Sequence, residues 1–359
     1  MKTGILTFNR AYNYGAVLQC YALQEILKRR GMDVYVIDYR QPWIDDFYKT
    51  VSWNQIRRNS GSLKGLFSYL KGNLKKFMVS PFRRCYFNSF TKAYLRLTEP
   101  TDRSSIPSDM DCYVIGSDQL WSLHCLGGQL DPVYMGDFHH NADSSVVGYA
   151  ISADKNSILS SAAVIKSSYS NFTSLSMREK EIADKVSEIA GSPCEVCMDP
   201  TLLTDADLWE PVINDKWKSR KYILVYEVRW KKETRNHLRR KAEELAARIG
   251  KDCEIIVLSG MRYPVGDFVS LFKYAAYVVT TSFHGVVFSL LFERPFYAFP
   301  LWDGYDLRYR ELLESVGAAD RLLQMDAEVL PTPMDFAPVK KLLSDRRKDS
   351  FDFIDKFIK

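Results

Sequence analysis

The 359-residue chain contains no apolar run that approaches the roughly 18 residues of a membrane span. Its amino terminus, MKTGILTFNRAYNYGAVLQ, becomes polar too soon for a signal peptide. The seven cysteines are an odd number without the spacing of a disulfide framework, which is typical of a reducing compartment. These absences argue against membrane-spanning and disulfide-rich secreted classes, and we expect a cytoplasmic protein.

Signatures of bound cofactors and metals are also missing. The turn after the first expected strand reads NRAYNYG, from Asn9 to Gly15, rather than GxGxxG, so an ordinary nicotinamide site is not supported. Cys194 and Cys197 form a CxxC without a second pair or histidines at ligand spacing. No cluster of Asp and Glu demands a metal, and we expect neither a metal nor a cofactor.

Acidic residues are absent from one long segment, residues 47–98. Its eleven Lys and Arg residues exceed the net charge of the whole chain, +5, so the remainder is net acidic. Aromatic and aliphatic residues alternate with these charges at helical spacing, as in segments that lie on anionic membranes. A solvated helical insertion and a nucleic-acid surface are the alternatives, but no nucleic-acid-binding signature accompanies the charges. The residues expected at the membrane surface are Arg57, Arg58, Lys71, Lys75, Lys76, Arg83 and Arg84.

Strands and helices alternate along the rest of the chain. Apolar runs predict strands at 2–8, 33–38, 110–115, 145–150, 221–226, 254–258 and 277–280. Amphipathic patterns predict helices at 12–30, 231–249, 265–274 and 339–358. This rhythm favours an α/β fold with two Rossmann-like domains that face a cleft.

The expected domain boundaries follow from this pattern. The first domain spans residues 1–190 and carries the basic aromatic insertion at 47–98. The second spans 191–335, and residues 336–359 form a helix that packs back on the first domain.

The segment Tyr277 to Phe296, YVVTTSFHGVVFSLLFERPF, combines a strand, a turn of small residues and a short helix. Ligands bind at such turns in α/β proteins, and the helix amino terminus offers amide donors to an anion. His284 lies at this turn, with Ser282 and Gly285 beside it. In the simpler alternative, His284 is a core or capping residue and Ser282 is only the helix N-cap.

Small polar turns also follow two expected strands of the first half, at Ser117 and Ser152. An arginine near such turns suits a phosphate or carboxylate because its planar fork pairs with two oxygens, and Arg178 is the candidate. The alternative is an exposed ion pair of Arg178 with Glu179 and Glu181 at a helix end.

The turn before the first helix holds Asn13 and Gly15. Both suit a close backbone approach to a ligand, and both equally suit the start of a helix.

Seven segments, in order along nearly the whole chain, resemble the polysaccharide pyruvyl transferase family. In that family Asp or Arg often precedes the Phe-His-Gly element, one position before its Ser or Leu, where this chain has Thr281. The segments are NYGAVLQCYAL (13–23), IGSDQLW (115–121), GYAISA (148–153), SLSMRE (174–179), MDPTLL (198–203), TTSFHGVVFSLLFERPF (280–296) and RRKDSFDFI (346–354).

The resemblance implies a GT-B-like fold and transfer of a pyruvyl group from phosphoenolpyruvate to a sugar of a bacterial surface glycan, such as a capsule or exopolysaccharide. The product would be a cyclic ketal across two hydroxyls, with release of phosphate. His284 matches the family's essential histidine and Arg178 the arginine expected to hold the donor's anionic groups; these two are the catalytic candidates. The expected donor-binding residues are Asn13, Gly15, Ser117, Ser152, Arg178, Ser282 and Gly285.

The expected partners are phosphoenolpyruvate, an acceptor glycan on polyprenyl diphosphate and the anionic inner face of the membrane, with no nucleic acid. Residues 47–98 would hold the enzyme at that face as a peripheral protein. The alternatives are a GT-B glycosyltransferase that uses a nucleotide sugar, and a non-catalytic, membrane-associated partner in glycan assembly.

Overall fold

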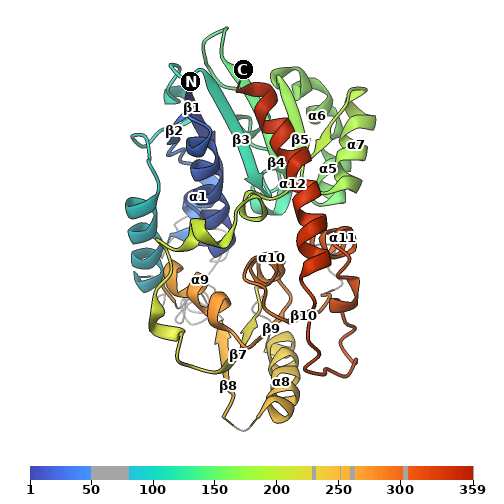
Figure 1. The fold of residues 1–359 in the computed structure, drawn as a ribbon. Coiled ribbons are helices and arrows are strands. Elements are labelled where there is room, and N and C mark those ends of the chain that lie inside the picture. Colours follow the sequence, from blue (N-terminus) through green and yellow to red (C-terminus); the bar gives the residue numbers. More distant parts are fainter. Residues whose placement is uncertain (50–80, 229–231, 251, 259–262, 302–305, 359) are drawn as a thin grey trace, which may run out of the picture.

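The computed structural model describes residues 1–49, 81–228, 232–250, 252–258, 263–301 and 306–358. Two parallel sheets with helices packed against them lie in the upper and lower halves of Figure 1. The predicted α/β fold of two Rossmann-like halves is confirmed.

The first sheet has six parallel strands in the order β2-β1-β3-β4-β5-β6. Every residue of β3 is buried, and residues 112–115, CYVI, accordingly read as a continuous apolar run rather than an alternation. The strands are β1 (Lys2–Leu6), β2 (Asp33–Val36), β3 (Cys112–Asp118), β4 (Ser145–Ile151), β5 (Ser174–Met177) and β6 (Glu195–Val196). The helices are α1 (Tyr14–Arg29), α2 (Pro42–Tyr48), a helix at 81–94, α5 (Lys155–Ser160), α6 (Ala162–Ser168) and α7 (Lys180–Ala190).

The second sheet has four parallel strands in the order β10-β9-β7-β8. Its strands are β7 (Tyr222–Tyr226), β8 (Glu254–Leu258), β9 (Tyr277–Thr280) and β10 (Phe296–Ala298). Its helices are α8 (Lys232–Ile249), α9 (Val265–Tyr274), α10 (Phe283–Leu291) and α11 (Leu307–Ser315).

Three short strands have no counterpart in the predicted set. β6 and β10 have two and three residues, too few to produce a pattern, and β5 reads SLSM, without the apolar run that marked the buried strands. Because β6 pairs with β5, the first sheet continues beyond residue 190, where the sequence pattern ended the first domain. We therefore propose a boundary after Val196.

The last helix, α12 (Ala337–Phe357), runs from the second half back along the first, and its end lies near the amino terminus in Figure 1. The Phe353 ring lies 6.1 Å from the ring of Tyr149 on β4. The Ser350 hydroxyl accepts a hydrogen bond of 2.9 Å from the Met198 amide, so this helix joins the two halves.

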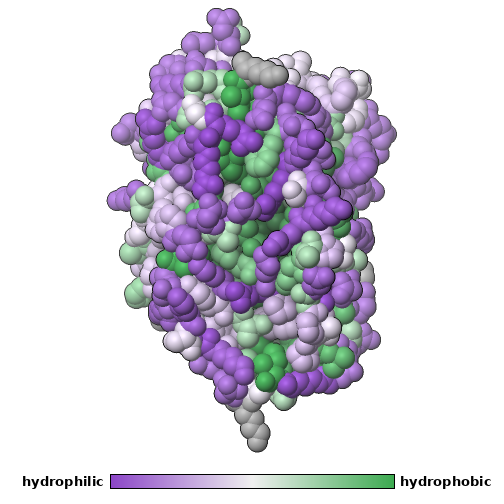
Figure 2. Space-filling model, in the orientation of Figure 1, coloured by the Kyte–Doolittle hydropathy of each residue, from purple (hydrophilic) through white to green (hydrophobic). Residues whose placement is uncertain are grey.

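Hydrophilic residues cover most of the face drawn in Figure 2, and hydrophobic ones gather toward its middle. Among the described residues, none of the helices is both long and apolar enough to cross a bilayer.

The return of α12 predicts unequal effects for two phenylalanines on that helix. Phe353→Ala should lower the free energy of unfolding by about 3–5 kcal/mol, because it opens a cavity in the core. Phe351→Ala is the matched control, since this half-buried ring packs against the Arg30 guanidinium and should cost less than half as much. Urea unfolding followed by circular dichroism measures both, and equal losses would contradict the docking of α12.

Candidate active site

The turn between β9 and α10 is built by a helix cap. Ser282 is the N-cap of α10, and its hydroxyl accepts a hydrogen bond of 3.3 Å from the Gly285 amide. A side chain at Gly285 would lie 2.2 Å from the Thr280 hydroxyl, so glycine is required for this close packing. The Gly285 amide therefore serves the cap, which corrects its expected role as a donor for the ligand.

His284 lies in the first turn of α10 and is only 8% exposed. Its ring packs directly on Gly15 of α1, where an added Cβ would lie 2.1 Å from Nδ1. The close backbone approach expected at Gly15 is thus made to a histidine of the other half rather than to a ligand. The position of the imidazole depends on the absence of a side chain at residue 15.

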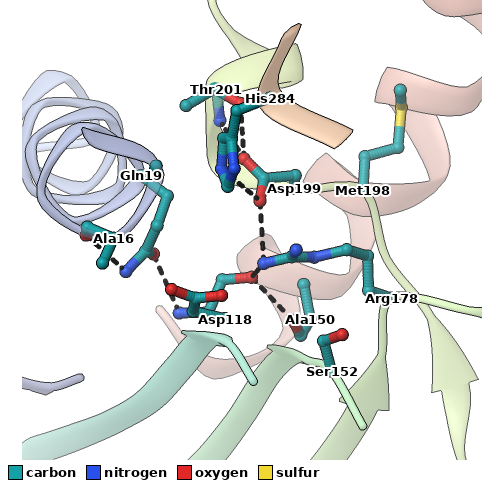
Figure 3. A network of polar contacts seen from close by, with 12 residues as sticks. Ala16, Gln19, Asp118, Ala150, Ser152, Arg178, Met198, Asp199, Thr201 and His284 are labelled. Atoms are coloured by element: carbon teal, nitrogen blue, oxygen red, sulfur yellow. Dashed lines mark hydrogen bonds and ion pairs between the residues drawn. The ribbon is translucent and has the colours of Figure 1, made fainter. Parts of the chain in front are cut away.

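Asp199 is the residue on which this site converges, although sequence reasoning did not select it. The carboxylate is fully buried, and its Oδ2 lies 3.8 Å from His284 Nε2 and 2.8 Å from Arg178 Nη2. The amide and hydroxyl of Thr201 both donate to Oδ1 (Figure 3). One feature of the sequence pointed to Asp199: it stands directly before Pro200, where it can cap the following 3-10 turn.

Arg178 follows β5 and is 7% exposed, which excludes the exposed ion pair with Glu179 and Glu181. Its Nη2 donates to the Ser117 hydroxyl at 2.6 Å, and that hydroxyl donates to the carbonyl of Ala150 (Figure 3). Nε and Nη1 are buried without a hydrogen-bond partner among the described residues. Arg178 therefore fixes the position of the Asp199 carboxylate. It is not among the residues that line the main cavity, which lies between the two halves.

Ser117 and Ser152, which were also expected to bind the donor, form hydrogen bonds within the protein. Ser117 and Ser152 are both fully buried, and the Ser152 hydroxyl donates to Glu179 Oε1 at 2.8 Å. Neither serine lines the cavity, which corrects their expected contact with the donor. Asn13 does line the cavity, but its side chain caps α1 by accepting from the Gly15 amide.

The main cavity has a volume of about 330 Å³ and lies between the two halves. The second half contributes Ser282, His284 and Arg308, among others. The first half contributes Asp118 and three aromatic residues of α2, namely Trp43, Phe47 and Tyr48. Sequence reasoning missed Arg308, which no motif marks, and Asp118, whose position at the end of a strand in GSDQ was a usable signal.

Of the seven residues expected at the membrane surface, Arg83 and Arg84 lie in the described part of the chain. Arg83 is 9% exposed, and its guanidinium lies 5.7 Å and 5.4 Å from the ring centres of Tyr12 and Tyr48. It supports aromatic rings inside the protein, so its expected place at a membrane is wrong. Arg84 is exposed. The other expected contacts lie outside the described residues, namely Arg57, Arg58, Lys71, Lys75 and Lys76.

Comparison with known families identifies this arrangement. A model of the polysaccharide pyruvyl transferases matches residues 13–303, which is most of the chain and includes Gly15, Asp118, Arg178, Asp199 and His284. The chain belongs to the polysaccharide pyruvyl transferase family. This match confirms the family resemblance that the sequence motifs indicated. The protein is therefore a transferase. No curated protein matches the chain.

One solved structure similar to this chain is the UDP-GlcNAc 2-epimerase of Methanocaldococcus jannaschii. The two share 11% sequence identity with a TM-score of 0.43, and the match covers 96% of this chain and 92% of the epimerase. Another is the heptosyltransferase WaaC of E. coli with ADP, with 9% identity and a TM-score of 0.38 over 96% and 100% of the two chains. These scores are low, so the function must be argued from the chain's own residues.

The groups around His284 shift its pKa in opposite directions. Burial lowers the pKa of His284, and Asp199 and Asp118 offset part of that effect. Burial alone would raise the pKa of Asp199, but Arg178 and His284 bring it below its usual value. At neutral pH this places a neutral imidazole beside an ionised carboxylate.

A double-mutant cycle should reveal the contact between Gly15 and His284. Gly15→Ala forces the imidazole aside and should destabilise the protein, whereas the same change in a His284→Ala background meets no ring and should cost much less. We expect a coupling of about 1–3 kcal/mol from urea unfolding of the four proteins. Additive effects would show that the ring does not rest on Gly15.

Histidine NMR should report the charge arrangement. The titration midpoint of His284 should lie below 6.5, and Asp199→Asn should lower it further because an anion that favours the imidazolium is lost. Asp118→Asn should act in the same direction without disturbing the ion pair of Arg178. Asp205→Asn, at an exposed ion pair with Arg347, is the control and should leave the midpoint unchanged. A midpoint that rises in either active-site variant would contradict this arrangement.

Proposed function

We propose that this protein transfers a pyruvyl group from phosphoenolpyruvate to a sugar of a bacterial surface polysaccharide, or of its lipid-linked precursor, and forms a cyclic ketal. The observation that carries the proposal is the position of His284, held by Gly15 and Asp199 at the wall of a cavity between the two halves. A histidine in this position can exchange a proton with a ligand in the cavity.

The anionic donor is proposed to lie on the side of the second half. Arg308 is the one Lys or Arg side chain among the described residues that line this cavity. The first turn of α10, with Ser282 and His284, faces the same space, and amides at a helix amino terminus favour negative charge. Arg308 and these amides would neutralise the carboxylate and phosphate of the donor, while Arg178 positions Asp199 and thereby His284.

The reaction needs two proton transfers that His284 can serve. One sugar hydroxyl attacks carbon 2 of phosphoenolpyruvate, while a proton reaches the methylene carbon and converts it to a methyl group. The second hydroxyl then attacks carbon 2 as the bond to the phosphate oxygen breaks, and its proton leaves with the phosphate. The neutral imidazole can accept a hydroxyl proton and return it, and no metal enters these steps.

We also propose that the enzyme works in the cytoplasm, on an acceptor linked to polyprenyl diphosphate at the inner face of the membrane. The support is the charge of residues 47–98, which hold ten basic side chains besides the buried Arg83, and no acidic ones.

Donor binding tests the proposal directly. Calorimetric titration of the purified protein should show binding of phosphoenolpyruvate and none of common nucleotide sugars. Arg308→Ala should weaken donor binding about tenfold or more, because a charge-assisted contact is lost. Arg310→Ala, on the same helix but outside the cavity lining, is the matched control and should bind normally.

Turnover separates the alternatives. His284→Ala should bind phosphoenolpyruvate but release no phosphate in the presence of acceptor. Binding of a nucleotide sugar alone would favour the glycosyltransferase alternative. A folded protein that binds neither class would favour the non-catalytic partner.

A further inference from the structure

The side of the cavity formed by the first half has a chemistry that the anionic donor does not need. Trp43, Phe47 and Tyr48 of α2 all line it, and we call these three residues the aromatic shelf. Trp43 and Phe47 are four residues apart and so lie on one face of the helix. The shelf presents rings rather than cations to the cavity.

The aromatic shelf is held in place by residues behind it. The Trp43 ring rests against Gly127, where a Cβ would lie 2.6 Å from the indole, and the φ of +79° at this position also favours glycine. The Tyr48 ring lies 5.2 Å from the ring of Tyr12, and the Arg83 guanidinium lies over both. This packing accounts for a buried arginine within the basic segment, residues 47–98.

Polar groups complete this side of the cavity. Asp118, Gln119 and His124 line it together with the aromatic shelf. Asp118 has a φ of 84°, rare for a residue with a side chain, and such strain is concentrated at functional sites. Asp118 is 8% exposed, and its carboxylate accepts a hydrogen bond from the Gln119 amide.

The charges divide the cavity between two kinds of ligand. Arg308 and the amino terminus of α10 lie on the other side and favour an anion there. Asp306 also lines that side, but its carboxylate already accepts hydrogen bonds from the Leu301 amide and the Tyr309 hydroxyl. The carboxylate of Asp118 disfavours an anion beside the aromatic shelf. A lipid tail would offer no hydrogen bond to Asp118 Oδ2 or to the Gln119 side-chain oxygen. A neutral sugar satisfies both features, because its hydroxyls pair with carboxylate and amide groups and its C–H faces stack on the negative faces of aromatic rings.

We infer that the aromatic shelf, with Asp118 and Gln119, is the subsite for the acceptor sugar, a hexopyranose stacked on Trp43 and Phe47. This inference rests on the proposed function, since it places the acceptor opposite the phosphoenolpyruvate site. His284 lies in the wall between the two subsites, where it can reach a hydroxyl of one ligand and carbon 3 of the other.

Saturation-transfer NMR with three probes, the methyl glycosides of glucose, galactose and mannose, tests the subsite without turnover. The wild-type protein should bind at least one of them, and Trp43→Ala and Phe47→Ala should each weaken that binding at least about fivefold. Phe47 is 52% exposed, so its truncation leaves the fold intact. Phe82→Ala, at a ring that is 64% exposed and outside the cavity lining, is the matched control and should bind the sugar as the wild type does.

Calorimetry with phosphoenolpyruvate on the same four proteins separates this inference from the proposed function. Donor affinity should stay within about twofold in all of them. Donor binding without any glycoside binding, or glycoside binding that is indifferent to Trp43 and Phe47, would overturn the subsite and leave the proposed function standing. Glycoside binding that depends on the aromatic shelf in a protein that does not bind phosphoenolpyruvate would support the subsite and remove the proposed donor.

Discussion

The buried pair of Arg178 and Asp199 is the interaction on which the site depends. Both groups are removed from water, which is costly unless each charge finds a partner and further hydrogen bonds. Ser117 and Thr201 supply those bonds, so the pair fixes the carboxylate at the ends of the first sheet's strands. The carboxylate is then free to act on one remaining neighbour, the imidazole of His284.

The same arrangement makes the site a property of both halves together. His284 belongs to the second half, yet Gly15 and Asp199, which hold it, belong to the first half and to the connection that follows β6. A second link crosses nearby, because Glu311 of α11 accepts hydrogen bonds from the amides of Lys180 and Glu181 at the start of α7. A motion that separated the halves would release the imidazole from Gly15 and Asp199.

Local sequence patterns were sufficient to predict the fold and to locate His284 at a strand-to-helix turn. Buried parallel strands read as continuous apolar runs, and the turn after β9 combines such a run with a capping serine, both of which are visible in a short window. Asp199 and Arg178 are 21 positions apart in the chain, and nothing local indicates that they meet. The same limit applies to Gly15, whose reason for being glycine lies on a helix 269 positions away. For Arg83, charge alone suggested exposure, but the residue is buried and its guanidinium lies over two tyrosine rings.

The most direct test of this account is a crystal structure of the protein with phosphoenolpyruvate. The account predicts the donor in the cavity between the halves, with its anionic groups at Arg308 and the first turn of α10. Its methylene carbon should lie about 3–3.5 Å from a ring nitrogen of His284, a distance suited to proton transfer. Phosphoenolpyruvate bound away from His284, or a His284 ring that has left Gly15 and Asp199 in the complex, would contradict it.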